Sequence, residues 1–168
     1  MRQILFKAKR IDNGEWVEGL YFKVPKDEFG ARIICENVIL PDYLKPYDYY
    51  RYYIIQNNTE DNSKLYGTIA SDSHEIDLET LCQYTGIKDK NDNKIWENDI
   101  ISIDTYDYTE PSECFFGKVV YCNAWACWCI KQSGEEKPIP LCECEGSYLT
   151  KREIEGNTFD NPELLEEL

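Results

Sequence analysis

The chain has 168 residues, of which 42% are apolar and 14% aromatic, and it carries a formal net charge of −14 at pH 7. This apolar content excludes global disorder, and a chain of this length can bury a core without disulfide or metal crosslinks. The negative charge repels phosphate backbones and anionic lipid surfaces, so nucleic acid and membranes are disfavoured as partners. Thirteen Tyr and four Trp against one Met favour strands over a helical bundle.

The chain is expected to work in the cytoplasm. No apolar run reaches the ~20 residues that a transmembrane helix needs, and residues 1–10 lack the apolar core and cleavage site of a signal peptide. In that compartment the eight cysteines stay reduced, so disulfides are not expected.

The first predicted element is an antiparallel hairpin. Residues 4–9 alternate imperfectly between apolar and polar side chains, a strong Asp-Asn-Gly turn sequence ends at Gly14, and residues 16–24 supply the second strand. Gly19 inside the second strand indicates a bulge or a close backbone contact. Four further elements are expected in chain order: an apolar run at residues 31–40, a tyrosine-rich strand at residues 49–55, a mobile polar loop at residues 57–64 and a short strand at residues 65–70.

A second hairpin is predicted in the second half of the chain. The strand-like residues 83–86 lead through the polar turn 88–94 into an apolar run at residues 96–103. A polar loop is expected at residues 105–113, and residues 115–130 hold one long strand or two shorter ones.

A short helix is expected at the end of the sequence. Asn161 is a good N-cap residue, and Pro162 suits the first helical position. Leu164, Leu165 and Leu168 would then share one face. So short a helix has to dock on the rest of the protein.

These elements together predict a mainly β fold of the β-rich α+β kind. We expect an N-terminal antiparallel sheet, then a small SH3-like barrel half, then the short C-terminal helix. Residues 1–76 would form the N-terminal subdomain and residues 77–168 the barrel-like C-terminal subdomain, in one compact unit.

Three separated blocks of the sequence carry a family pattern. The first block is Met1–Lys9 with Asn13–Gly19, the second is Gln83–Lys90 with Ile95–Ile100, and the third is Glu155–Asn157 with Asp160–Leu165. Their motif residues are Gln83, Tyr84, Thr85, Gly86, Lys88, Asp89, Trp96, Glu97, Asp99, Gly156, Asn157, Asn161 and Pro162. In this order they resemble the YopX family of small proteins carried by phages and prophages. The resemblance implies a β-rich fold and a phage context within a bacterial host cell, and it implies no settled biochemical activity.

The chain departs from the family pattern at two turns. Family members usually carry Asn-Gly where this chain has Asp92-Asn93, and Glu-Gly-Asp where it has Glu97-Asn98-Asp99. Because Asn tolerates the left-handed backbone better than most residues, we expect both turns to be kept.

Tyrosines supply the candidate interaction residues. They cluster at Tyr47, Tyr49, Tyr50, Tyr52 and Tyr53. Aromatic residues interleaved with cations can stack on single-stranded bases, but they also suit protein interfaces. The net charge of −14 favours an interface or a core position over base stacking.

The cysteines offer a possible metal site. Cys127 and Cys129 are separated by one residue, as are Cys142 and Cys144. On a strand this spacing puts both sulfurs on one face, so two neighbouring strands could offer four thiolates to zinc. The alternative, which we prefer, is that they are small core residues, because free Cys is often buried.

No common catalytic or nucleotide-binding signature occurs, so no catalytic residue and no cofactor are predicted. Our main hypothesis is a non-enzymatic protein-interaction module that forms a homo-oligomer and binds a host or phage protein. A second hypothesis is an acidic counter-defence or regulatory inhibitor of a host nucleic-acid-binding protein. A third is a small-ligand binder or enzyme with a site between the two halves.

Overall fold

The structure, a computed structural model, describes residues 4–26, 50–56, 73–106, 113–135, 137–141 and 149–166. The chain divides into two compact units, an N-terminal unit of Leu5–Leu81 and a C-terminal unit of Met1–Ile4 with Cys82–Leu168. Antiparallel strands make up most of the described residues in both units. The predicted mainly β fold is therefore confirmed.

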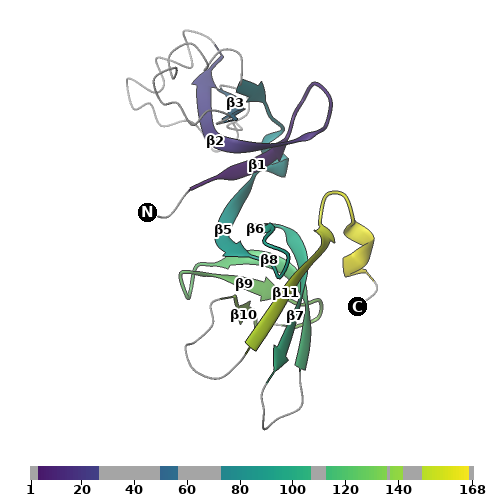
Figure 1. The fold of residues 1–168 in the computed structure, drawn as a ribbon. Helices are drawn as coiled ribbons and strands as arrows, with labels where there is room; N and C mark the ends of the chain where they lie inside the picture. The colour runs from purple at the N-terminus through teal and green to yellow at the C-terminus, as the bar shows by residue number, and fades with distance from the viewer. Residues whose placement is uncertain are drawn as a thin grey trace. The chain divides into compact units, whose positions relative to one another are not determined.

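The N-terminal unit contains the strand order β4-β3-β2-β1 (Figure 1). The strands are β1 (Phe6–Lys9), β2 (Trp16–Pro25), β3 (Tyr50–Ile55) and β4 (Ser73–Glu75). β1 and β2 form the predicted hairpin, in which Phe6 lies opposite Gly19 and Lys9 opposite Trp16. Gly14 in the turn has a φ of 72°, which glycine adopts without steric cost.

Alternate side chains of these strands build the core of the N-terminal unit. Ala8, Val17 and Ile54 are buried in it. Because successive side chains of a strand point to opposite sides, this core defines an inner face of the sheet and leaves an outer face. Gly19 belongs to the inner face, and a Cβ atom there would lie 1.9 Å from the carbonyl oxygen of Ile55. The close backbone contact predicted at Gly19 is confirmed.

A short 3-10 helix, η3 (Leu78–Thr80), follows β4. The Asp77 carboxylate accepts a hydrogen bond from the backbone N–H of Glu79 at 3.0 Å. The hydroxyl oxygen of Thr80 accepts one from the backbone N–H of Lys9 at 2.8 Å. These two bonds fix the start of η3 and hold it against β1.

The C-terminal unit contains a hairpin and a five-stranded sheet of order β10-β9-β8-β7-β11 (Figure 1). The hairpin consists of β5 (Cys82–Lys88) and β6 (Lys94–Trp96). The sheet consists of β7 (Asp99–Tyr106), β8 (Glu113–Cys122), β9 (Cys127–Lys131), β10 (Ile139–Pro140) and β11 (Leu149–Asn157). The core of this unit includes Ile95, Ile101, Val119, Ile130 and Leu141.

The hairpin predicted around residues 88–94 is confirmed, and residues 115–130 contain two strands rather than one. The apolar run predicted at residues 96–103 is instead divided between two strands, because β6 ends before β7 begins. Asn98 between them has a φ of 65°. This left-handed conformation interrupts the extended strand. Asn adopts it more readily than most residues do, as predicted for this turn.

Two finer predictions differ from the structure. The described pairings end at β10 on one side and at β11 on the other, so the sheet is open and the expected SH3-like barrel is not confirmed. The C-terminal helix is a single 3-10 element, η4 (Pro162–Leu165). Asn161 makes no side-chain capping bond to it. Its Oδ1 atom instead accepts a bond from the backbone N–H of Asn157 at 3.4 Å.

Some predictions fall outside the described residues. These are the elements at residues 31–40, 57–64 and 65–70 and the side chains of Tyr47, Tyr49, Cys142, Cys144 and Leu168. Among the residues that the structure describes, no helix has the length and apolar character that crossing a bilayer requires.

Candidate interaction surface

An apolar stripe runs along β2 and β3 on the outer face of the N-terminal unit. In the antiparallel register Leu20 lies opposite Ile55 and Phe22 opposite Tyr53, and such cross-strand partners project on the same side. Leu20 is 50% exposed and Val24 40% exposed. The rings of Phe22 and Tyr53 stack with centroids 5.3 Å apart. We call these residues the outer-face stripe: Leu20, Phe22, Val24, Tyr53 and Ile55.

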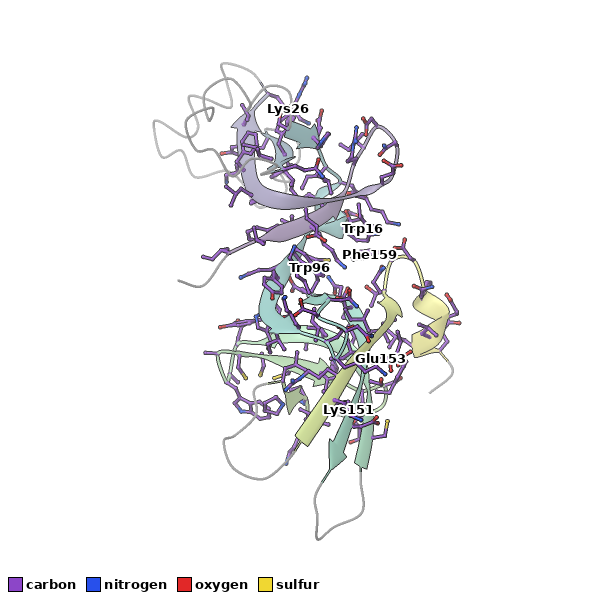
Figure 2. All side chains as sticks on the ribbon, viewed as in Figure 1. Trp16, Lys26, Trp96, Lys151, Glu153 and Phe159 are labelled. Carbon is purple, nitrogen blue, oxygen red and sulfur yellow. The ribbon has the colours of Figure 1, made fainter. Side chains whose placement is uncertain are left out.

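Charges of both signs border the outer-face stripe. By the same register five charged residues share the outer face: Lys7, Lys9, Glu18, Arg51 and Glu75. The ammonium nitrogens of Lys7 and Lys9 lie 5.0 and 5.5 Å from the ring centroid of Trp16, within the range of cation–π attraction. Figure 2 shows Trp16 at one end of β2 and Lys26 beyond the other. Among the residues that the structure describes, this face carries three cations and two carboxylates, whereas acidic residues predominate in the chain as a whole.

The predicted tyrosine cluster is divided between the two faces of β3. Tyr53 projects on the outer face, whereas Tyr50 and Tyr52 project on the inner face. Tyr52 is buried, and its ring lies 6.3 Å from that of Tyr21. Burial also raises the pKa of Tyr21 above its ordinary value. Core packing therefore accounts for Tyr52, and Tyr53 is the cluster member that contributes to the outer-face stripe within the described part of β3.

Leu20, Phe22 and Val24 are not among the interface residues predicted from the sequence. The sequence of β2 nevertheless carries apolar residues on both faces of the strand. Val17 and Tyr21 point to the inner face, and Leu20, Phe22 and Val24 point to the outer face. A strand that is apolar on both faces is usually covered on both faces. The alternation of β2 was therefore a signal that could have identified the outer face as a candidate surface.

A cavity of about 440 Å³ lies in the N-terminal unit. It is lined by parts of β1 and its following turn, by the ends of β2 and β3, and by the segment from β4 to η3. Its charged lining residues are four cations, Lys9, Arg10, Lys26 and Arg51, and two carboxylates, Glu75 and Asp77. The chain as a whole has 18 cationic and 32 acidic residues. Two of these cations have partners of their own, because the ammonium nitrogen of Lys9 lies over the ring of Trp16 and Arg10 pairs with the carboxylate of Asp12.

Asp89, from the second sequence block, organises the turn of the β5–β6 hairpin. Its Oδ1 atom accepts hydrogen bonds from the backbone N–H groups of Asn91 and Asn93, both at 2.8 Å, and its Oδ2 atom accepts one from the Asn93 amide at 3.0 Å. Burial acts to raise the pKa of Asp89. The bonds from Asn93 and Asn91, with one from the backbone N–H of Ile154, outweigh burial and hold the pKa below its ordinary value. Asp89 therefore joins the turn to β11.

Lys90 makes a second link from this turn to β11. Its backbone N–H donates to the carbonyl oxygen of Arg152 at 2.8 Å. Its ammonium group pairs with the carboxylate of Glu153, which Figure 2 labels on β11. Nearby, Lys88 pairs with Asp92 at 2.7 Å, four residues along the turn.

Other residues of the second block pack inside the C-terminal unit. Asp99 is buried, and its Oδ2 atom accepts a hydrogen bond from the backbone N–H of Trp96 at 2.7 Å. The ring of Trp96 lies 5.4 Å from that of Tyr84. The Thr85 hydroxyl donates to the carbonyl of Ile95 at 2.7 Å.

The remaining residues of the second block shape the backbone. The backbone N–H of Glu97 donates to the carbonyl of Gln83 at 2.9 Å. Gly86 has a φ of 86°, a conformation that L side chains rarely adopt.

The third block builds the turn between β11 and η4. The side-chain oxygen of Asn157 accepts bonds from the backbone N–H groups of Phe159 and Asp160, at 2.9 and 3.0 Å. A Cβ atom on Gly156 would lie 2.6 Å from the Asn161 side-chain oxygen. Pro162 then opens η4. The family-motif residues described here thus make turns and core contacts in the C-terminal unit.

The cysteines of β8 and β9 share one face, as the spacing predicts. Cys122 lies opposite Cys127 in the register, and the sulfur atoms of Cys127 and Cys129 are 3.8 Å apart. Cys129 is fully buried. Within the described residues, no group of three or more His, Cys, Asp or Glu side chains is arranged to hold a metal ion.

We expect Cys129 to be the slowest of the described thiols to react with an aromatic disulfide reagent at pH 8. Burial, with the neighbouring Cys127 and Cys122 thiols, raises the pKa of Cys129 to about 12, and the thiolate is the reacting form. Mass spectrometry of the folded protein should show Cys114 modified before Cys129, because Cys114 is exposed and Cys129 is buried. Unfolding in guanidinium should remove the difference. Equal modification of both thiols in the folded state would contradict the burial of Cys129.

The chain matches one protein-family model. The model described as YopX protein matches residues 6–166 of the chain, which includes the second and third sequence blocks and most of the first. A comparison with curated proteins gives no match.

Proposed function

Because the chain belongs to the YopX family, which suggests a phage-type protein, we propose that it is a non-catalytic interaction module of the host cytoplasm that self-associates through the outer-face stripe. The observation that carries this proposal is the exposure of Leu20 and Val24 beside the stacked rings of Phe22 and Tyr53. Contiguous exposed apolar patches mark interaction sites. Aromatic residues are enriched in the cores of protein interfaces.

The partner that we propose for this stripe is a second copy of the chain. Two copies with a net charge of −14 repel each other over most of their surfaces. The outer face is a place where they can approach, because the described strands place three cations and two carboxylates on it. A patch that carries both signs of charge can also be complementary to itself, as a two-fold symmetric interface requires.

The double substitution Leu20→Asp and Val24→Asp is expected to shift the protein to monomer. It removes two apolar anchors and places carboxylates where the two copies would meet. The dissociation constant of self-association should rise by at least about tenfold, which corresponds to ~1.4 kcal/mol. Sedimentation velocity from low to high micromolar protein, with near-ultraviolet circular dichroism to check the fold, measures this change.

The matched control changes two other exposed apolar residues, Tyr121→Asp and Trp125→Asp, in the C-terminal unit. It adds the same charge to the protein away from the outer-face stripe. We expect the control to leave the oligomeric state unchanged. A wild-type protein that stays monomeric throughout, or equal effects of the two double variants, would exclude self-association through the stripe.

A further inference from the structure

Three thiols gather on one face of the β8–β9 hairpin. Cys122 ends β8 and Cys127 begins β9, and the two lie directly opposite each other in the antiparallel register. Two residues further along β9, Cys129 projects on the same face, with its sulfur atom 3.8 Å from that of Cys127. The chemistry that such a cluster offers through its own side chains is the joining of two thiols.

The backbone favours one pair of these thiols for a disulfide, which requires Cα atoms about 4.4–6.8 Å apart. Residues directly opposite in an antiparallel pair have Cα atoms about 4.5–5.5 Å apart, so Cys122 and Cys127 meet this requirement. Cys127 and Cys129 are two residues apart on one extended strand, about 6.4–6.8 Å, which is the limit of the range. Cys122 and Cys129 are diagonal neighbours, about 7–8 Å apart, which is beyond it.

Exposure separates the three thiols in the same way. Cys122 and Cys127 are partly exposed, whereas Cys129 is fully buried. An oxidant dissolved in water can therefore reach the opposed pair more readily than the third sulfur. Burial, with contacts to the Cys127 and Cys122 thiols, also raises the pKa of Cys129 to about 12. Since the thiolate is the nucleophile in disulfide formation, Cys129 competes poorly with either neighbour.

The hairpin holds the opposed pair in place before any bond forms. Residues 123–126 connect the two cysteines, and within this turn the backbone N–H of Trp125 donates to the carbonyl of Cys122 at 3.3 Å. In the next pair of the register the rings of Tyr121 and Trp128 lie 5.2 Å apart, edge to face. Two thiols fixed in this way react with each other at a high effective concentration.

From these observations we propose that Cys122 and Cys127 form an oxidant-responsive pair, which a hydroperoxide converts to a cross-strand disulfide. With hydrogen peroxide, one sulfur attacks a peroxide oxygen, the O–O bond breaks, and the thiol proton leaves with the other oxygen as water. The product is a sulfenic acid. The second sulfur then attacks the first, the S–O bond breaks, the S–S bond forms, and a second water leaves with the second thiol proton. The two thiols lose two electrons, and the peroxide gains them.

Such a bond agrees with a reducing cytoplasm, where disulfides are usually transient or redox-sensing. Small thiols such as glutathione reverse it by thiol–disulfide exchange. The pair lies in the C-terminal unit, and its oxidation needs no self-association through the outer-face stripe. Either proposal can therefore fail alone.

Peptide mapping tests the pair in the full chain. Reduced protein is treated with hydrogen peroxide, alkylated, digested without reductant and analysed by mass spectrometry. Cys122 and Cys127 should be joined to each other, at a yield at least about tenfold above that of any other disulfide. Dithiothreitol should restore both thiols. The proposal would be overturned if both stayed free at a peroxide concentration that oxidises glutathione in a parallel sample, or if either were joined mainly to another cysteine.

Two variants separate the pair from its buried neighbour. Cys122→Ser should leave Cys127 without a disulfide partner, so that its sulfinic acid rises at least about tenfold over wild type. Cys129→Ala should change the yield of the Cys122–Cys127 bond by less than about twofold. Near-ultraviolet circular dichroism of the reduced proteins checks the fold, and the wild-type map decides the question if a variant does not fold. Loss of the bond in folded Cys129→Ala, or efficient joining of Cys127 to Cys129 in Cys122→Ser, would show that the strand register does not select the pair.

Discussion

Replacing Gly19 by alanine is expected to lower the free energy of unfolding of the N-terminal unit by more than about 3 kcal/mol. The loss is large because the added atom would clash with backbone atoms, which cannot move aside as a flexible side chain can. The added Cβ atom would lie 1.9 Å from the carbonyl oxygen of Ile55 and 3.1 Å from a side-chain carbon of Ile54. Relief requires β2 and β3 to separate at Leu20 and Ile55, which are paired in the register. Urea unfolding, together with hydrogen exchange of the β2 and β3 amides, measures the loss.

Gly14→Ala is the matched control for this prediction. Gly14 has a φ of 72°, but a Cβ atom there would meet nothing within 4 Å. Its replacement therefore costs only the strain of a left-handed backbone, about 1–2 kcal/mol. A loss of stability in Gly19→Ala no larger than that in Gly14→Ala would contradict the close approach of β2 to β3. Hydrogen exchange in the C-terminal unit should change little in either variant.

Asp89→Asn is expected to destabilise the C-terminal unit by about 2–3 kcal/mol at pH 7. An amide can keep its oxygen toward the two backbone donors, but its NH2 group then faces the side-chain amide donor of Asn93 and all the bonds lose a charged acceptor, which contributes about 1.5–3 kcal/mol to each bond. The donors are the N–H groups of Asn91 and Asn93 and the Asn93 amide. Urea unfolding monitored at the C-terminal unit measures the change.

The effect of Asp89→Asn should also depend on pH. The pKa of folded Asp89 is lowered, so it lies below the unfolded value of about 3.9. Ionised Asp89 therefore stabilises the folded state fully above the unfolded pKa, and this contribution is lost as the pH falls through the folded pKa. The difference in stability between wild type and Asp89→Asn should therefore shrink as the pH falls below the unfolded pKa.

Asp92→Asn is the control, because it removes the same charge from the same turn. Asp92 is exposed and pairs only at the surface with Lys88, and such pairs contribute about 0–1 kcal/mol. Asn also tolerates the positive φ of 69° at this position. A pH-independent loss in Asp89→Asn, or an equal loss in Asp92→Asn, would refute the role of Asp89 as the centre of the turn.

Local sequence signals predicted the N-terminal hairpin well. The turn ending at Gly14, the strand over residues 16–24 and the contact at Gly19 each depend on neighbouring residues, so the sequence carries them directly. The outer-face stripe could not be identified in the same way. It exists because β3 pairs with β2 in a register that places Tyr53 beside Phe22. The pairing register of two strands that are far apart in the chain cannot be predicted from the sequence of either strand alone.

The predictions for the C-terminal unit that differ from the structure failed for physical reasons. Trp96 and Ile100 are apolar residues on either side of Asn98, so the apolar run looks continuous although the backbone turns at Asn98. Asn161 has the residue type of an N-cap, but its side chain bonds back to Asn157 instead. A barrel and an open sheet share the same strands and differ in long-range pairing, which the alternation of side chains does not determine.

The place of β11 has a consequence for how this polypeptide is made. β11 pairs with β7, so that Leu149 meets Tyr106 and Asn157 meets Asp99. During synthesis β7 leaves the ribosome well before its partner exists. Until then a row of unsatisfied amides and carbonyls is open to any nascent chain nearby. Slow translation between the two segments should therefore favour aggregates, and chaperones that shield strand edges should raise the yield of native protein.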